Sequence, residues 1–585
     1  MGQCCFASGR TMRILLGLFL FPALLVAQQV PVKEHFLANG MKVLLVERHD
    51  APSISGGWVA RVGSVNERPG ITGIAHLFEH MMFKGTPTIG TKDYKKDLEI
   101  MAEQERVRDL MRVEDRKMRA MWRRGEITDL FDPEQKTKRW RELNDEFKKL
   151  VDAHRKVIVK NEFDRIYTSN GGSRMNAYTT YDHTAYFITV PSNKLELFMW
   201  MESGRLLEPV FREFYAERDV VFEERRMRTE STPLGKFSES FNSLFWESHP
   251  YGWPVIGWPS DIPAISKADA DEFYATFYVP ENLTLVLVGD FKSKEALVMA
   301  QKYFGRLKRG KKTVPDVITM EMPQNAEKRF YAEAETNPNV DIYWHTPAFG
   351  HKDTYALSVM SKILTGNTGR LKKELVLKSK LSTDTFAWTR GMHYAGQFNA
   401  GGEVADGKDP AAVEAAIHAV IEKLKTAPVP AKELQKVKNN FAAAEYRRLS
   451  SNHPILMQII RNEGTGDWRE LNTAGAKLQA VTAADIQRVA KKYFTKENRA
   501  VAIYTRKPGT GGGADDNPLL AGLSGQAKAM ARKVISSVNS DKDLDALKGR
   551  LRQIEEQLEK AGAKAPPIMK VIRAALRKRI GELEK

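Results

Sequence analysis

Residues Ile265 to Asn282 read ISKADADEFYATFYVPEN, and residues Val481 to Asn498 read VTAADIQRVAKKYFTKEN. The two stretches align without a gap. Each opens with a Ser or Thr that can cap a helix and has an Asp three residues later, which is the pattern of a capping box. Each ends its helical part with an aromatic pair and then continues through Glu-Asn into an apolar strand. This internal repeat predicts an α+β fold that contains two homologous α/β lobes.

The length and the loop-forming residues divide the chain around this repeat. At 585 residues the chain is too long for one hydrophobic core. Basic residues and prolines between the repeats indicate a linker, and a run of glycines follows the second strand. We therefore expect a first lobe at residues 28–308, a linker at 309–324, a second lobe at 325–508, and a Gly-rich joint with a basic helical tail at 509–585.

A long charged segment interrupts the first lobe from about residue 94 to residue 161. Both signs of charge are interspersed among helix-forming residues, which predicts a helical hairpin inserted into the lobe. A pattern of this kind usually belongs to a solvated helix face rather than to a binding surface. After the insertion, the alternation from Arg174 to Val190 predicts a strand that returns to the sheet.

The N-terminal segment is typical of a signal peptide. Arg10 and Arg13 precede the apolar run from Ile14 to Ala27, which is short for a membrane span. Both cysteines, Cys4 and Cys5, lie before this run, so cleavage after residue 27 would leave a chain without thiols. We predict export to the periplasm of a Gram-negative bacterium, and a retained membrane anchor is the alternative.

The chain is strongly basic. Its formal net charge is +17, and removal of residues 1–27, which hold two Arg and no acid, leaves 17 − 2 = +15. Such a balance can indicate nucleic-acid binding. We expect no nucleic-acid partner, because an exported protein seldom meets one and no basic-aromatic motif of a known module is present. The charge fits a solvated surface and a weak attraction to an anionic membrane surface or to acidic peptides.

The stretch His76-Leu77-Phe78-Glu79-His80 indicates the chemistry. Residues four apart stand on one face of a helix, so His76 and His80 can bind a single cation. Neutral imidazoles suit zinc, and the Glu79 carboxylate can take a proton from water at the metal. We expect this helix from about Thr72 to Lys84. With 12 histidines in the chain the pattern is fairly specific, and two surface histidines on an amphipathic helix are the alternative.

A catalytic zinc site usually has three protein ligands, so a third is needed. Glu217 and Glu224 lie two helical turns apart and share a helix face. Other glutamates are abundant. Without a further pattern, the stretch from 217 to 224 is equally typical of a charged, solvent-facing helix.

Several motifs together resemble the pitrilysin and insulinase family of zinc metallopeptidases with an inverted motif, closest to its processing-peptidase-like branch. The matching segments are Asn39-Gly40, Gly63-Ser64, Gly73 to Gly85, Asn176-Ala177-Tyr178-Thr179, Thr184-Ala185-Tyr186 and Glu217 to Glu224. The resemblance implies one zinc ion per chain, with His76, His80 and Glu224 as its ligands.

The same resemblance assigns further roles. It implies that Glu79 is the general base and that Glu217 is a carboxylate supporting the metal ligands. It also implies that Asn176, Ala177 and Tyr178 belong to an edge strand that pairs with the backbone of a peptide substrate.

One departure from the family pattern concerns the second lobe, which normally carries an Arg and a Tyr seven residues apart that help to hold the substrate carbonyl. Alignment of the preceding Gly369 to Leu375 places Val376 and Thr383 at these positions. Arg390 and Tyr394 are near but have the wrong spacing. The resemblance therefore predicts the zinc-bearing half of a heterodimer, in which a sister subunit supplies the pair.

Together these features predict an exported zinc-dependent endopeptidase that hydrolyses unfolded or extended peptides. The alternative is a non-catalytic assembly or binding subunit that retains the peptidase fold. Zinc content distinguishes the two hypotheses, because an assembly subunit has no need to retain a metal at a site with three ligands.

Overall fold

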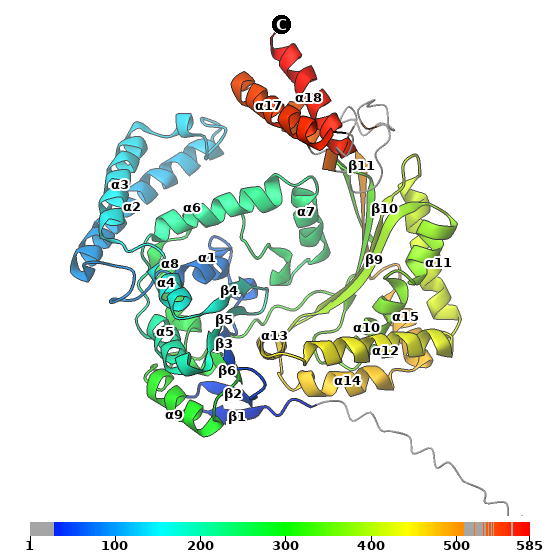
Figure 1. The fold of residues 1–585 in the computed structure, drawn as a ribbon, viewed down its shortest axis with the longest axis horizontal. Helices are drawn as coiled ribbons and strands as arrows, with labels where there is room; N and C mark the ends of the chain where they lie inside the picture. Colours follow the sequence, from blue (N-terminus) through cyan, green and yellow to red (C-terminus); the bar gives the residue numbers. More distant parts are fainter. Residues whose placement is uncertain are drawn as a thin grey trace, which may run out of the picture.

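The computed structural model describes residues 29–507 without a gap and, beyond them, residues 520, 530–531, 534–535, 537–539, 541, 543–562 and 566–584. The predicted signal peptide and the predicted Gly-rich joint lie outside the described residues. Two β-sheets, each with its own helices, form the two halves of the molecule (Figure 1).

The first sheet belongs to the N-terminal half and has six strands. Their order is β1 (Lys33–Phe36), β2 (Lys42–Glu47), β6 (Leu283–Gly289), β3 (Ser53–Ala60), β5 (Thr184–Pro191) and β4 (Ser173–Thr179). Strands β2 and β6 pair in parallel, and every other pair in this sheet is antiparallel. Strand β4 therefore lies at an edge, where its outer backbone groups are free to pair with another strand.

The second sheet repeats this arrangement with five strands. Their order is β7 (Lys328–Ala334), β11 (Arg499–Arg506), β8 (Asn339–Thr346), β10 (Gly396–Val404) and β9 (Ser382–Gly391). Here β7 and β11 are the parallel pair, and the remaining pairs are antiparallel. The order matches that of the first sheet without β1, so the prediction of two homologous α/β lobes is confirmed.

The repeated sequence has the same local structure in both lobes. Helix α8 (Lys267–Phe277) precedes β6, and helix α15 (Ala483–Tyr493) precedes β11. Ser266 accepts a hydrogen bond from the backbone N–H of Asp269 at 3.1 Å, and Thr482 does the same for Asp485 at 3.1 Å. Each Asp carboxylate accepts the return hydrogen bond, which completes the predicted capping boxes.

The remaining helices surround the two sheets. In the first lobe they are α1 (Ile74–Met81), α4 (Glu162–Ser169), α5 (Leu195–Leu207), α6 (Phe214–Arg225), α7 (Gly235–Phe245) and α9 (Ser293–Phe304). In the second half they are α10 (Asp353–Leu364), α11 (Pro410–Thr426), α12 (Ala431–Arg448), α13 (Asn452–Thr465) and α14 (Glu470–Ala480). Helices α17 (Leu544–Ala561) and α18 (Pro567–Leu583) form the tail, which lies above the end of β11 in Figure 1.

The charged insertion is a helical hairpin, as predicted. It consists of α2 (Tyr94–Arg123) and α3 (Lys138–Val157), which lie beside α6 in Figure 1. A buried cluster of charges fixes its base, where Asp97 of α2 bonds to His154 of α3 and to Arg212 just before α6. The insertion is therefore packed firmly onto the element that carries Glu217 and Glu224.

Two elements differ from the sequence prediction. The segment from Arg174 to Val190 forms two strands, β4 and β5, joined by a turn in which Thr180 N–H donates to the His183 carbonyl at 2.8 Å. Helix α1 is shorter than expected at both ends. It starts after Gly73, whose φ of 92° is left-handed, and the backbone beyond it tightens through i to i−3 bonds from Phe83 and Lys84.

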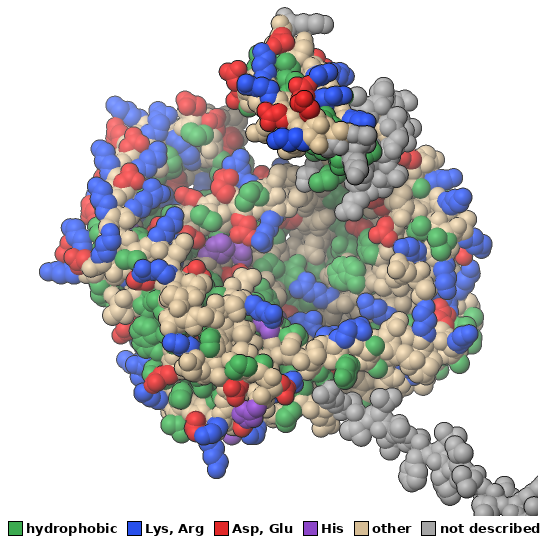
Figure 2. Space-filling view, in the orientation of Figure 1, with side chains coloured by type: hydrophobic (Ala, Val, Ile, Leu, Met, Phe, Trp, Pro, Cys, Tyr) green, Lys and Arg blue, Asp and Glu red, His purple; other side chains and the backbone are tan. Residues whose placement is uncertain are grey.

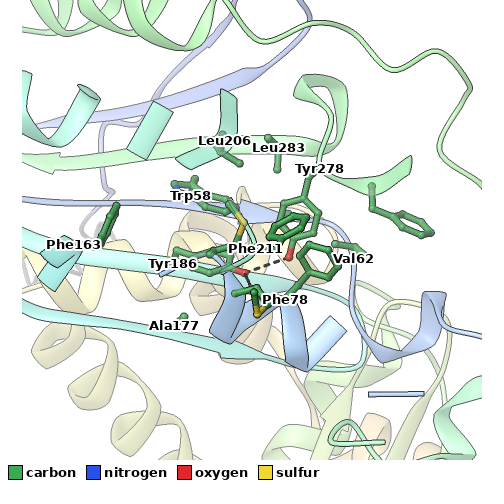
Figure 3. Close-up of a cluster of buried hydrophobic side chains, with 14 of the residues drawn as sticks. Trp58, Val62, Phe78, Phe163, Ala177, Tyr186, Leu206, Phe211, Tyr278 and Leu283 are labelled. Atoms are coloured by element: carbon green, nitrogen blue, oxygen red, sulfur yellow. Dashed lines mark hydrogen bonds between the residues drawn. The ribbon is translucent and has the colours of Figure 1, made fainter. Parts of the chain in front are cut away.

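The core of the first lobe fixes α1 against the sheet (Figure 3). Trp58 of β3 stacks on Tyr186 of β5 with ring centroids 4.1 Å apart. The Tyr186 hydroxyl donates to the backbone carbonyl of Phe78 at 3.2 Å and lies 3.2 Å from the hydroxyl of Tyr278. Phe78 lies between the two histidines in sequence, so its burial holds the metal-site helix in place.

Helix α13 joins the two halves. It belongs to the second half by its position in the chain, yet Ile455, Leu456, Ile459 and Ile460 pack on the face of the first sheet opposite to α1. Near the end of α13 the fully buried Glu463 accepts a hydrogen bond from Lys42 of β2 at 2.7 Å. A hollow opens between the two halves in Figure 2. The outer edge of β4 forms part of the wall of this hollow.

Candidate metal centre

Helix α1 is held in one orientation by bonds to its N-terminus and by burial of its apolar face. The buried Glu67 carboxylate accepts hydrogen bonds from the backbone N–H groups of Gly73 and Ala75, both at 2.9 Å. A side chain at Gly73 would collide with the Ile256 carbonyl, because its Cβ would lie 2.5 Å from that oxygen. Leu77 and Phe78 fill the core, and this leaves His76, Glu79 and His80 on the site face.

Helix α6 carries Glu217 and Glu224 on the face that points to α1, and its opposite face is buried. Its other face holds two buried arginines, of which Arg218 donates to the Ile265 carbonyl at 3.1 Å. Arg225 pairs with Glu239 at 2.7 Å and donates to the Gly257 carbonyl at 2.9 Å. These contacts fix the rotation of α6, and the two glutamates therefore face α1.

The structure brings His76, His80 and Glu224 together. One ligand atom from each lies within 4.8 Å of the others. The Nε2 atom of His80 is 3.4 Å from Glu224 Oε2, and the Nε2 atom of His76 is 3.9 Å from Glu224 Oε1. Among the described residues this is the one group of three His, Cys, Asp or Glu side chains spaced to hold a metal ion.

The environment of His76 suits a metal ligand. Burial is the main cause that lowers the pKa of His76, and together with the charges of His80 and Arg228 it brings this pKa to about 3. The ring is therefore neutral at pH 7 and has a lone pair for a cation. Its Nδ1 is buried and has no hydrogen-bond partner in the described part of the chain, whereas Nε2 faces Glu224 and Glu79.

His80 is held by a carboxylate on its far side. Its Nδ1 lies 3.4 Å from Glu217 Oε2, which leaves Nε2 for Glu224 and a metal. Burial lowers the pKa of His80, but the hydrogen bond and charge of Glu217 and the charges of Glu224 and Glu79 outweigh it, so the pKa is raised overall. Lys84 bonds to Glu217 and helps to keep the pKa of this carboxyl below its usual range.

Glu79 lies between the ligands and the edge strand. Its Oε2 is 4.0 Å from His76 Nε2 and accepts a hydrogen bond from the Thr179 hydroxyl of β4 at 2.7 Å. Burial raises the pKa of Glu79, although the Thr179 hydrogen bond opposes this. A carboxyl with a raised pKa beside a metal site is suited to accept a proton and to release it again.

The sequence interpretation missed one charged neighbour of the site. The Arg228 Nη1 atom lies 2.7 Å from Glu224 Oε1, and the arginine side chain is 71% exposed at the rim. The signal was present, because residues four apart on a helix are neighbours. The position of Arg228 could still not be predicted, because the chain beyond Arg225 forms a π-helical turn at Arg226–Glu230. Nothing in the local sequence indicates this turn.

A cavity of about 1130 Å³ connects these groups with the edge strand. The three ligands and Glu79 line it together with Asn176, Ala177, Tyr178 and Thr179 of β4. A second cavity of about 390 Å³ adjoins it and contains Glu79, His80, Asn176, Ala177 and Glu217 in its wall. All residues predicted for the site thus border these two cavities, and every lining residue belongs to the first lobe.

The other residues considered from the sequence lie elsewhere. Val376 is in a π-helical turn at Lys372–Lys378 and Thr383 is in β9, and neither borders the two cavities. His183 is buried in the β4–β5 turn, 3.3 Å from the Tyr178 hydroxyl. His345 stacks on Phe245 with centroids 3.9 Å apart. Both histidines lie in packed surroundings, away from the three ligands.

Two segments of the chain match known peptidase domains. Residues 42–105 match the family description "Insulinase (Peptidase family M16)", and residues 264–441 match "Peptidase M16 inactive domain". The zinc protease PqqE of Helicobacter pylori is 27% identical over 482 residues, which are 80% of this chain and 91% of that protein. The first match contains His76, Glu79 and His80.

Solved structures show the same fold. The crystal structure of a protease from Helicobacter pylori matches with a TM-score of 0.67 and 25% identity, over 82% of this chain and 100% of that one. The periplasmic protease PqqL from Escherichia coli matches with a TM-score of 0.60 and 16% identity, over 82% of this chain and 48% of that one. The chain thus carries the N- and C-terminal domains of the M16 peptidases and is homologous to the zinc proteases PqqE and PqqL, which is consistent with the pitrilysin and insulinase family.

Within the described residues, no helix has both the length and the apolar composition that a membrane crossing requires.

Proposed function

We propose that the chain is a zinc-dependent endopeptidase that cleaves extended or unfolded peptides. The observation that carries this proposal is the convergence of His76, His80 and Glu224 within 4.8 Å of one another. Two imidazoles and one carboxylate are a donor set that zinc uses at catalytic sites, where a fourth position stays open. The neutral state of His76 and the contact of His80 with Glu217 fit one zinc ion per chain.

When bound, zinc would act as a Lewis acid that polarises the scissile carbonyl and makes water nucleophilic at neutral pH. Glu79 would take the proton of the attacking water and later give it to the leaving amine. Its position supports both steps, because it lines the cavity beside the ligands and Thr179 holds one of its oxygens. Glu217 would keep the His80 ring oriented and would not touch the substrate.

Strand β4 would bind the substrate by its backbone. Its outer edge is unpaired among the described strands and runs past Glu79, since Asn176, Ala177 and Tyr178 line the same cavity. An extended peptide added to this edge would satisfy the free backbone groups with little demand on its side chains. The Thr179 to Glu79 hydrogen bond fixes the distance between this peptide and the base.

We further propose that the protein is exported and works as one half of a heterodimer. Export is supported by the segment before residue 28 and by the likeness to PqqL, whose structure is described as periplasmic. The heterodimer is supported by the absence of second-lobe residues from the walls of the two cavities in the described chain. The fold covers 48% of PqqL and also matches a separate structure of its first half.

The test is the variant Glu79→Gln, assayed on an unstructured peptide with and without a chelator. The wild-type chain should cleave the peptide in a chelator-sensitive way, and the variant should lose about 10²–10⁴-fold in rate, the usual contribution of a general base. Glu295→Gln, at an exposed glutamate of α9, is the matched control and should change nothing. Equal cleavage by Glu79→Gln and wild type would refute the mechanism, and cleavage by neither in the presence of the sister subunit would favour the non-catalytic subunit.

A further inference from the structure

The edge strand β4 has two faces that meet different surroundings. Ala177 packs into the core that holds α1, whereas Tyr178 packs against the cluster formed with α13. Side chains of a strand alternate between its faces, and a peptide paired with β4 would alternate in step with it. Every second substrate side chain would therefore face the metal-site helices, and those between would face α13 and the second lobe.

Three arginines from different elements surround the α13 side of this strand. Arg390 of β9 lies over the ring of Tyr181 in the β4–β5 turn, 5.1 Å from the ring centre. Arg461 lies on α13 three residues before Gly464, whose Cβ, if present, would be 2.4 Å from His183 of the same turn. Arg174 lies on β4 itself, and its charge adds to the burial that lowers the pKa of His453 on α13.

None of the three arginine side chains has a hydrogen-bond or ion-pair partner within the described residues, and all three residues are exposed. Two acids close to the turn in the structure are already engaged. Asp182 is buried and accepts from the Tyr251 hydroxyl and from the backbone N–H of His393. Glu463 is fully buried and pairs with Lys42 and Arg61. Within the described residues, the three arginine side chains therefore have no carboxylate at ion-pair distance, although the charge of Arg390 acts on the buried Asp182.

The opposite side of the cleft has the other sign of charge. The metal-site cavity is lined by four acids, Glu79 and Asp219, Glu223 and Glu224 of α6, against one cation, Arg228. Figure 2 shows Lys and Arg side chains gathered along the lower side of the hollow, away from the acidic and histidine side chains on its left. A peptide lying along β4 would thus have a basic surface on one side and an acidic surface on the other.

We propose that Arg174, Arg390 and Arg461 form a subsite that selects peptides with Asp or Glu at alternate positions, on the face of the bound strand that meets α13. This inference rests on the proposed peptidase function and names its substrate class. A carboxylate of a peptide bound along β4 would meet these three positive charges within about one Debye length, roughly 8–10 Å, over which attraction between exposed charges is only partly screened. Arginine also binds carboxylates in a two-pronged geometry that fixes their position.

The first test maps cleavage sites in a mixture of unstructured peptides of random sequence by mass spectrometry. The wild-type chain with zinc, with the sister subunit if it is required, should show Asp and Glu enriched at every second position around the cut bond. The double variant Arg390→Gln/Arg461→Gln should lose this enrichment and still cleave neutral peptides. Lys294→Gln, at an exposed cation of α9, should keep it. Absence of alternating enrichment in the wild type would overturn the proposal.

A second test, which measures binding, distinguishes failure of this proposal from failure of the peptidase function. Fluorescein-labelled peptides of alternating Glu-Ser, Lys-Ser or Ser alone are titrated against the full-length Glu79→Gln chain and followed by anisotropy. We expect the Glu-Ser peptide to bind best, and Arg390→Gln/Arg461→Gln in this background to weaken it about fivefold, the effect of two exposed charge pairs. Charge-dependent binding by this variant, with no cleavage by the wild-type chain, would refute only the peptidase function, whereas binding that ignores charge would overturn the subsite.

Discussion

His76 and His80 occupy equivalent positions on one helix, and their environments give them different states. His76 is buried and neutral, with a pKa lowered to about 3, while His80 rests on Glu217 and has a raised pKa. Both leave an Nε2 atom facing Glu224. The pair was predictable from the spacing of four residues. The choice of Glu224 among many glutamates came from the family resemblance and not from spacing, because a carboxylate 144 residues away (224 − 80) has no local signal.

The hydrogen bond from the Thr179 hydroxyl affects the pKa of Glu79, and this gives a prediction about the pH dependence of cleavage. The base must be deprotonated, so activity falls as the pH drops through the pKa of Glu79. The Thr179 hydrogen bond lowers this pKa against the effect of burial. Thr179→Val removes a lowering interaction, and the acidic limb of the kcat/KM profile should therefore move to higher pH.

The measurement is the pH dependence of peptide cleavage by both proteins at fixed ionic strength. Thr168→Val, which removes an exposed hydroxyl that bonds only to its own helix, should leave the profile unchanged. A limb that stays in place or moves to lower pH in Thr179→Val would contradict the assigned role of Glu79.

At the scale of elements, the inserted α2–α3 hairpin is tied to the site by buried charge. Arg212 is 1% exposed on its side chain, bonds to Asp97 of α2 and donates to the carbonyls of Thr86 and Ile89 at 2.7 and 2.9 Å. These carbonyls belong to the loop that follows α1. The insertion therefore supports the metal-site helix as well as α6, a role that its solvated charge pattern did not predict.

Replacement of Arg212 tests this support. Arg212→Leu should lower the free energy of unfolding by about 3–5 kcal/mol, because it leaves the buried Asp97 without its arginine partner. Urea denaturation measures the change. Arg106→Leu, which removes exposed pairs with Glu103 and Glu146, should cost about 0–1 kcal/mol. Equal effects of the two substitutions would show that the buried pair does not hold the insertion.

Some secondary-structure elements could be predicted from local sequence, and others could not. The capping boxes of α8 and α15 were predictable because Ser266 and Thr482 act within four residues. The turn between β4 and β5 was missed, since Tyr181-Asp182-His183 contains neither Gly nor Pro. Its shape depends on distant groups, among them Tyr251, which bonds to Asp182 across the lobe.

At the scale of the whole molecule, the internal repeat predicted two lobes but not their contact. Helix α13 has the apolar face of an ordinary amphipathic helix, which does not indicate the surface it packs on. The structure shows that this face packs on the first sheet. Glu463 on α13 binds Lys42, and its Oε2 atom is buried without a partner among the described residues. The two halves are thus fixed to one another by a helix that belongs to one and packs on the other.

The division of the site between two chains is a prediction at this scale. The chain alone should cleave an unstructured peptide about 10²-fold or more below the rate reached with a sister subunit, which is the usual effect of a missing carbonyl-binding group. Co-expression with candidate sister chains, followed by co-purification and a peptide assay, measures the difference. Full activity of the lone chain would contradict the split site.

Zinc analysis of the purified chain tests the central claim most directly, because the claim is that His76, His80 and Glu224 form one metal site. After incubation with zinc and dialysis, inductively coupled plasma mass spectrometry should find about one zinc ion per wild-type chain, the occupancy of a three-ligand site. The double variant His76→Ala/His80→Ala should retain almost none, with its fold intact by circular dichroism. A wild-type chain without zinc, or a double variant that keeps as much as wild type, would contradict the account.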